Sequence, residues 1–149
     1  MSNAFMTLAL EQAEAAAARA EVPVGAVLVM GEDVLAASGN RILEFKDPTA
    51  HAEILVIREA AAKLGNERLM GAELYVTLEP CAMCAGAISF ARIAKVVFAA
   101  SDPKGGAVIS GSKFFESPTC HWRPDVTQME GAAVDQASSL LKDFFRARR

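Results

Sequence analysis

Two short segments hold residue types that commonly bind metal ions. Cys81 and Cys84 are separated by two residues, a spacing at which two thiolates can hold one ion, and His51 lies upstream of them. Together they offer three ligands, one fewer than a closed tetrahedral zinc site requires. In a catalytic zinc site the open fourth position holds water. The sequence therefore predicts a catalytic metal site rather than a structural one.

A carboxylate accompanies the predicted ligands, because Glu53 follows His51 by two residues. Two thiolates and one imidazole favour zinc, and a zinc ion in an open site lowers the pKa of bound water to about 7. A neighbouring carboxylate can take up and deliver the protons of that water. We therefore expect hydrolytic chemistry, with one Zn²⁺ per chain as cofactor and Glu53 as the proton shuttle.

A helix that contains both cysteines is expected over residues 80–90. Pro80 suits the first turn of a helix because proline lacks the N–H that is unpaired there. Cys81 and Cys84, three positions apart, would face the same side of this helix. The partial positive charge of a helix N-terminus favours thiolates.

The remaining elements follow from apolar patterning and from turn and cap signals. Strands are expected over 25–30, 34–38, 73–78 and 95–100. A fifth, edge strand is expected over 123–129, although Pro124 cannot donate to a ladder. Further helices are expected over 5–20, from a cap at or near Thr49 to Leu64, and over 132–149. His51 and Glu53 would then lie in the first turn of the second helix. Residues 39–48 and 101–118 are expected to be irregular.

The order of these elements predicts the architecture. Residues 34–38 return antiparallel to 25–30, whereas the later strands alternate with helices, which implies parallel pairing through right-handed crossovers. Helices would then cover both faces of the sheet. We expect residues 1–149 to form a single α/β domain, a three-layer α/β/α sandwich with a central mixed five-stranded sheet.

Composition limits the compartment and the partners. The chain has 149 residues, 52% of them hydrophobic and 22% charged, which predicts a substantial core rather than disorder. Three cysteines do not form a disulfide framework, which fits a cytoplasmic location, and no apolar run is long enough to span a membrane. A net charge of −3 argues against indiscriminate nucleic-acid binding but does not exclude RNA.

The two motifs together, His-x-Glu and Pro-Cys-x-x-Cys, are the signature of zinc nucleobase deaminases. Segments 21–29, 47–53, 74–87 and 144–149 resemble the bacterial tRNA-specific adenosine deaminases, and the resemblance covers nearly the whole chain. It implies the cytidine-deaminase fold, a zinc cofactor and a homodimer. It also implies that the substrate is a tRNA anticodon stem-loop, in which the wobble adenosine of an arginine tRNA becomes inosine.

The resemblance implies roles for residues around the predicted metal site. The three ligands would hold zinc, and Glu53 would protonate adenine at N1 and then the departing amine during hydrolysis at C6. The residues implied for substrate binding are Asn40 for the flipped base, Pro23, Val24 and Leu78 for the pocket walls, and Asp102 for the ribose and backbone. The run that begins at Asp102 departs from the family, which commonly has Lys-Thr-Gly after this acid, and residues 111–121 depart as well. The RNA contacts of both segments stay open.

Three other interpretations of the motifs remain. A free-base deaminase acting on guanine or cytosine would share the fold and the zinc signature. A non-catalytic, zinc-stabilised RNA-binding module would use the same ligands without turnover. Cys120 and His121 could join the two other cysteines in a closed structural zinc site, although this leaves the pairing of His51 with Glu53 unexplained.

Overall fold

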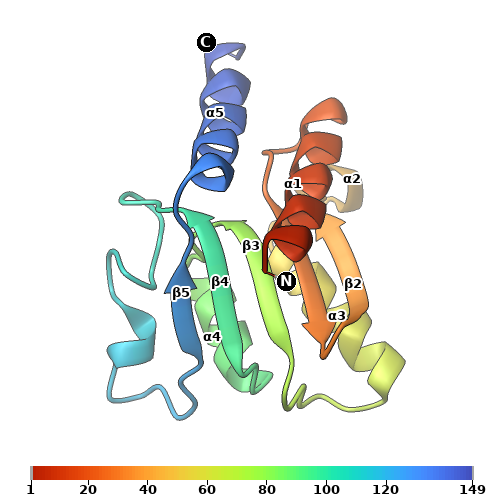
Figure 1. Cartoon of the computed structure of the whole chain (residues 1–149), viewed down its shortest axis with the longest axis vertical. Coiled ribbons are helices and arrows are strands. Elements are labelled where there is room, and N and C mark those ends of the chain that lie inside the picture. The colour runs from red at the N-terminus through yellow and green to blue at the C-terminus, as the bar shows by residue number, and fades with distance from the viewer. Residues whose placement is uncertain (1, 149) are drawn as a thin grey trace.

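A five-stranded sheet separates the helices into two layers in the computed structural model, which describes residues 2–148 (Figure 1). The strands are β1 (Gly25–Met30), β2 (Asp33–Gly39), β3 (Glu73–Leu78), β4 (Lys95–Ala100) and β5 (Asp125–Gln128), in the spatial order β2-β1-β3-β4-β5. β1 runs antiparallel to β2 and β3, whereas β3, β4 and β5 are parallel. The mixed five-stranded sheet is confirmed, including the edge strand β5.

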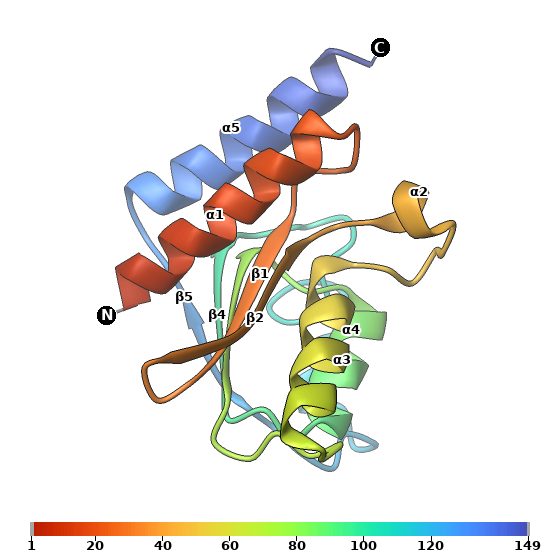
Figure 2. The same cartoon turned by 90° about the vertical axis from the view of Figure 1, so that its right-hand side faces the viewer.

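The helices cover both faces of this sheet. They are α1 (Ser2–Ala18), α2 (Ile42–Phe45), α3 (Ala52–Leu64), α4 (Ala82–Phe90) and α5 (Ala132–Arg146), with a 3₁₀ turn at Phe114–Glu116. Figure 2 shows α1 and α5 side by side on one face and α3 and α4 on the other. The three-layer α/β/α architecture is therefore confirmed.

Parallel pairing was predicted more widely than it occurs. α3 connects β2 to β3, but these strands are not neighbours, because β1 lies between them and pairs antiparallel with both. The tight turn at Gly31, whose φ is 63°, closes β1 and β2 into a hairpin, and β1 is the strand of this hairpin that pairs with β3. The first crossover must therefore pass over β1 before the chain re-enters the sheet.

Several helix ends differ from the prediction. The first helix, expected over 5–20, spans Ser2–Ala18. It ends before Ala20, because that residue adopts a positive φ of 68°. The last helix ends at Arg146 rather than at 149. The short helix α2 lies within residues 39–48, which were expected to be irregular. The sequence did not reveal this helix because four helical residues are too few to produce a periodic pattern.

The core has two halves, one on each face of the sheet. Alternate strand residues point to opposite faces, so neighbours such as Val27 and Leu28 enter different halves. Members of the half under α3 and α4 include Leu28, Val56, Leu74, Ile88, Val96 and Phe98. Members of the half under α1 and α5 include Met6, Leu10, Val27, Val29, Tyr75 and Val97.

Close contact between α1 and the sheet requires glycine in the strands. The alanines of α1 that face the sheet are fully buried, among them Ala9 and Ala13. A Cβ on Gly25 would lie 1.9 Å from the carbonyl oxygen of Ala9, and one on Gly39 would lie 2.5 Å from that of Gln12. The small residues on both sides therefore set the distance between helix and sheet.

Residues 2–148 contain no helix long and apolar enough to cross a membrane.

Cys81, Cys84 and Cys120 are free thiols. Cys84 and Cys120 are buried, whereas Cys81 is partly accessible. The accessible thiol belongs to the motif for which chemistry was predicted.

We expect Gly25→Ala to destabilise the protein by at least about 3 kcal/mol, because the added methyl group meets backbone atoms of α1 that cannot move independently. Urea denaturation measures this loss. Gly86→Ala is the matched control, since a Cβ there meets no atom within 4 Å and alanine favours the α4 helix. Equal stability of the two variants would contradict the assigned packing of α1.

Candidate active site

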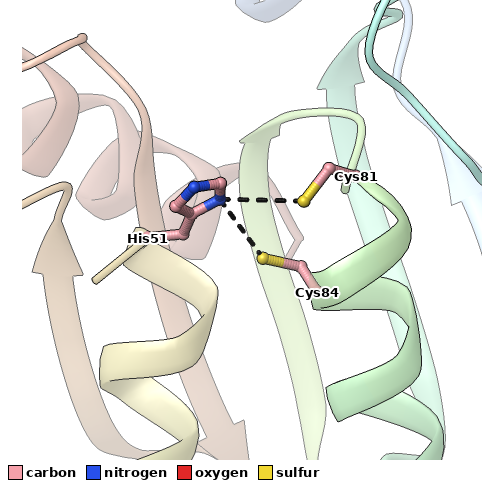
Figure 3. A group of neighbouring side chains, drawn as sticks. All are labelled: His51, Cys81 and Cys84. Atoms are coloured by element: carbon pink, nitrogen blue, oxygen red, sulfur yellow. Dashed lines mark hydrogen bonds between the residues drawn. The ribbon is translucent and has the colours of Figure 1, made fainter. Parts of the chain in front are cut away.

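Two helix N-termini meet next to the carboxyl end of β3. His51 is the N-cap of α3, and Cys81 is the N-cap of α4. Only residues 79–81 separate β3 from α4, so the strand fixes where the cysteine segment begins. Figure 3 shows the side chains of His51, Cys81 and Cys84 directed toward one another from these two helices.

The helix α3 begins at Ala52, and its N-cap residue is His51 rather than Thr49. The backbone N–H and the hydroxyl of Thr49 donate to the carboxylate of Asp47, at 2.9 and 2.7 Å, and form a turn before the helix. The first helical N–H, that of Ala52, donates instead to Oδ1 of Asn40 at 2.8 Å. His51 therefore lies just outside the first turn, in extended conformation, whereas Glu53 lies within that turn.

The helix carrying the cysteines begins later than predicted. Pro80 precedes the helix, and Cys81 has extended backbone angles of φ −76° and ψ 176°. Cys84 is the third helical residue. An N-cap side chain lies over the third helical residue, so the two sulfurs still converge.

The three side chains fit a tetrahedral metal ion. Nδ1 of His51 lies 3.7 Å from Sγ of Cys81 and 3.6 Å from Sγ of Cys84 (Figure 3). The three ligand atoms all lie within 4.8 Å of one another. Usual zinc bond lengths with tetrahedral angles separate a nitrogen from a sulfur ligand by about 3.6 Å. Nδ1 is therefore the histidine nitrogen available to a metal.

The two thiols differ in acidity. The pKa of Cys81 is lowered to about 4, chiefly because the Cys84 thiol donates a hydrogen bond to its thiolate, with His51 contributing. The pKa of Cys84 is raised, first by that same hydrogen bond and then by burial. A divalent cation opposes the second shift because it stabilises a thiolate directly. The site thus presents one thiolate in advance and can supply a second when metal binds.

Glu53 is a carboxyl group that can change protonation state near neutral pH. Its side chain is almost completely buried, at 4% exposure. Burial raises its pKa to about 7, although its own backbone N–H and the neighbouring His51 oppose the shift. A group with this pKa can both accept and donate a proton at neutral pH, as a general acid and base must.

A cavity of about 230 Å³ opens onto this cluster. This volume is smaller than that of most ligand sites and suits one small group rather than a helix or an extended polymer. Its lining residues are Val22, Val24, Asn40, Ile42, His51, Glu53, Leu78, Glu79, Cys81, Asp102 and Gly105. The structure therefore places most of the sequence-predicted site residues around a single cavity.

Four of the five residues predicted for substrate binding line this cavity, and Pro23 does not. Val24 and Leu78 line it directly, and Asp102 contributes from the loop after β4. Pro23 is buried between Val22 and Val24. Asn40 uses its Oδ1 to cap α3, which leaves its NH₂ group as the hydrogen-bond donor of this side chain.

Sequence reasoning missed four of the lining residues: Val22, Ile42, Glu79 and Gly105. Ile42 lies on α2, which the sequence pattern did not reveal. Glu79 had a visible signal, since it is a charged residue at the end of a buried strand and directly precedes Pro80. The positions of Val22 and Gly105 depend on how loops fold back onto the sheet, which no local sequence pattern indicates.

Cys120 lies in a different environment from the two other cysteines. Its Sγ is 3.5 Å from the hydroxyl oxygen of Ser89 and 3.1 Å from the carbonyl oxygen of Trp122. Among residues 2–148, His51, Cys81 and Cys84 form the one cluster of three or more His, Cys, Asp or Glu side chains that could hold a metal. The closed structural site with Cys120 is therefore not formed.

Comparison with known proteins identifies relatives along the full chain. Residues 2–149 match the model of the MafB19-like deaminase family. The tRNA-specific adenosine deaminase of Agrobacterium fabrum is 59% identical over 145 residues, which cover 97% of this chain and 94% of the relative. The enzyme of the same name from Aquifex aeolicus is 43% identical over the same shares of the two chains.

Solved structures show the same relationship. A structure from studies of A-to-I editing by tRNA:A34 deaminases superimposes with a TM-score of 0.90 at 58% identity, covering 93% of this chain and 99% of that one. Guanine deaminase from Nitrosomonas europaea superimposes with a TM-score of 0.72 at 28% identity, covering 95% and 82%. The chain belongs to the family of tRNA-specific adenosine deaminases.

Proposed function

We propose that this protein hydrolyses the wobble adenosine of a tRNA anticodon loop to inosine, releasing ammonia, and that the tRNA is an arginine tRNA. The observation that carries the proposal is the cavity in which buried Glu53 adjoins a three-ligand metal site. The 59% identical tRNA-specific adenosine deaminase supports the choice of substrate. We propose further that residues 1–149 act as one domain, in a cytoplasmic homodimer.

Zinc is the cofactor that fits this donor set, with one ion per chain held by His51, Cys81 and Cys84. Two thiolates and a neutral imidazole neutralise its charge, which lowers the cost of holding the ion in a partly buried site. When bound, zinc acts as a Lewis acid that lowers the pKa of water to about 7.

Glu53 performs the proton transfers in the proposed reaction. Its carboxylate accepts one proton from the attacking water and delivers it to N1 of adenine. It then accepts the proton of the hydroxyl group newly bound to C6 and passes it to the departing amine, which leaves as ammonia. The pKa of about 7 permits both directions of transfer at neutral pH. The burial of Glu53 also keeps bulk water from competing for these protons.

The surrounding residues select and hold the base. The NH₂ group of Asn40 donates to the purine. Val24 and Leu78 form the walls of the base pocket, with Pro23 fixing the backbone next to Val24, and Asp102 meets the ribose and backbone. The target base must leave its stack to enter a cavity of this size. An anticodon loop is already single-stranded, so this step costs less free energy than in a duplex.

Free guanine is the alternative substrate that a specific observation supports. The guanine deaminase from Nitrosomonas europaea shares the fold, but at 28% identity it is much more distant than the tRNA-specific relatives.

The decisive experiment incubates the zinc-loaded protein with an arginine-tRNA anticodon stem-loop, and in parallel with free guanine, and analyses the products for inosine and for deaminated guanine. A stem-loop with guanosine at the wobble position is the control. Conversion of free guanine without inosine formation would overturn the proposal.

We expect Glu53→Gln to reduce turnover by at least about 10³-fold while zinc stays bound, because the amide preserves shape but cannot shuttle protons. Inosine formation and zinc content should be measured on the same preparation. Activity close to that of the wild type in this variant would support a different proton shuttle, and full biological function without turnover would support an RNA-binding module.

Cys84→Ala should lose both zinc and stability, because metal binding and folding are coupled at such a site. Cys120→Ala is the matched control, since it also removes a buried thiol but lies outside the ligand cluster. Metal analysis and thermal unfolding report the two effects. Full zinc occupancy in Cys84→Ala would remove this residue from the ligand set.

The raised pKa of Glu53 has a consequence for the metal-free protein. The folded state holds the proton up to a pH of about 7, whereas the unfolded chain releases it near 4.5. The free energy of unfolding therefore falls as the pH rises between these values, by on the order of 3 kcal/mol. Glu53→Gln removes this titration, so after chelation it should be more stable than the wild type at pH 8 and not at pH 4.5. An equal difference at both pH values in urea denaturation would contradict the pKa assignment.

A further inference from the structure

Glu79 is a buried carboxylate that accepts hydrogen bonds from both ends of the 102–110 loop. Its side chain is 2% exposed and lies directly before Pro80. Oε1 accepts the N–H of Asp102 at 2.9 Å. Oε2 accepts the N–H groups of Val108, Ile109 and Ser110 at 3.0, 2.9 and 2.9 Å. The hydroxyl of Ser110 also donates to Oε1, at 3.0 Å.

These bonds replace the regular structure that the loop lacks. Residues 101–110 form neither helix nor strand, yet their buried N–H groups need acceptors. Glu79 supplies acceptors to both ends of the loop, and the carbonyl of Pro80 accepts the N–H of Ala107 at 2.9 Å. The loop is therefore folded against residues 79–80 rather than against itself alone.

The held loop forms part of the cavity wall. Asp102 and Gly105 line the cavity, and Oδ1 of Asp102 accepts the N–H of Gly105 at 3.0 Å. Because Glu79 accepts the N–H of Asp102, it fixes the backbone from which that side chain extends. Glu79 is also two residues before Cys81, so the turn that presents a metal ligand also sets the position of this wall.

Gly106 shows how closely the loop fits the carboxylate. A Cβ at this position would lie 2.4 Å from the carboxyl carbon of Glu79 and 2.6 Å from Oε1. It would also lie 2.6 Å from the carbonyl oxygen of Asp102. A side chain larger than hydrogen would therefore displace either the carboxylate or the loop.

We propose that Glu79 is a positioning residue for the substrate, which shapes the 102–110 loop so that Asp102 and Gly105 meet the RNA beside the base pocket. Only a carboxylate suits this task, because both of its oxygens accept hydrogen bonds. In glutamine one of them becomes an NH₂ group that faces other N–H donors. This inference rests on the proposed function and assigns Glu79 to binding rather than to proton transfer.

The test is steady-state kinetics of zinc-loaded Glu79→Gln with the anticodon stem-loop. We expect KM to rise about tenfold, because several charge-assisted hydrogen bonds are weakened, while kcat stays within about threefold and zinc stays at one per chain. Glu116→Gln is the control for the lost negative charge, since Glu116 is exposed and lies in the same region. A KM equal to that of the control, or a loss confined to kcat, would overturn the proposal.

Two further measurements separate this proposal from the proposed function and from misfolding. Ser110→Ala removes a single donor to Glu79 and should raise KM by about two- to threefold, so an unchanged KM would count against the proposal. Hydrogen exchange of the Val108, Ile109 and Ser110 amides needs no substrate. These amides should exchange at least tenfold faster in Glu79→Gln, even if the wild type forms no inosine, and unchanged exchange would overturn the role of Glu79.

Discussion

The incomplete tetrahedron formed by His51, Cys81 and Cys84 is the constraint on which the rest of the site depends. Two ligands are N-cap residues, whose extended backbone directs their side chains past the end of a helix. The layer of α3 and α4 against one sheet face is what brings these ends together (Figure 2). A fourth protein ligand would close the site, so its absence from the cluster in residues 2–148 leaves a position for water.

Glu53 and Glu79 are two buried glutamates next to this centre, and their different surroundings shift the pKa of their carboxyl groups in opposite directions. Burial dominates at Glu53 and raises its pKa to about 7, where proton transfer is effective. Burial would also raise the pKa of Glu79, but the N–H groups of the loop lower it below its usual value. Glu53 can therefore exchange protons, whereas Glu79 remains an anion that shapes the wall of the cavity.

Much of this account could be predicted from sequence, because the relevant signals are local. The period-2 strands, the hairpin turn and the Cys-x-x-Cys spacing depend on near neighbours in the chain. The exact helix starts could not be predicted, since the cap of α3 comes from Asn40, whose position depends on tertiary folding. The shape of the 102–110 loop was inaccessible for the same reason, because its hydrogen-bond acceptor is Glu79, more than twenty residues away. The close contact of α1 with Gly25 could not be predicted either, because it depends on how the helix packs against the sheet.

X-ray absorption at the zinc edge of the loaded protein tests the central claim most directly, because it counts the ligands by element. The account predicts two sulfur neighbours at about 2.3 Å and two nitrogen or oxygen neighbours at about 2.0 Å, one of them His51 and the other from solvent. Three or four sulfur neighbours, or zinc that stays bound with the same spectrum after His51→Ala, would contradict an open site built on these three residues.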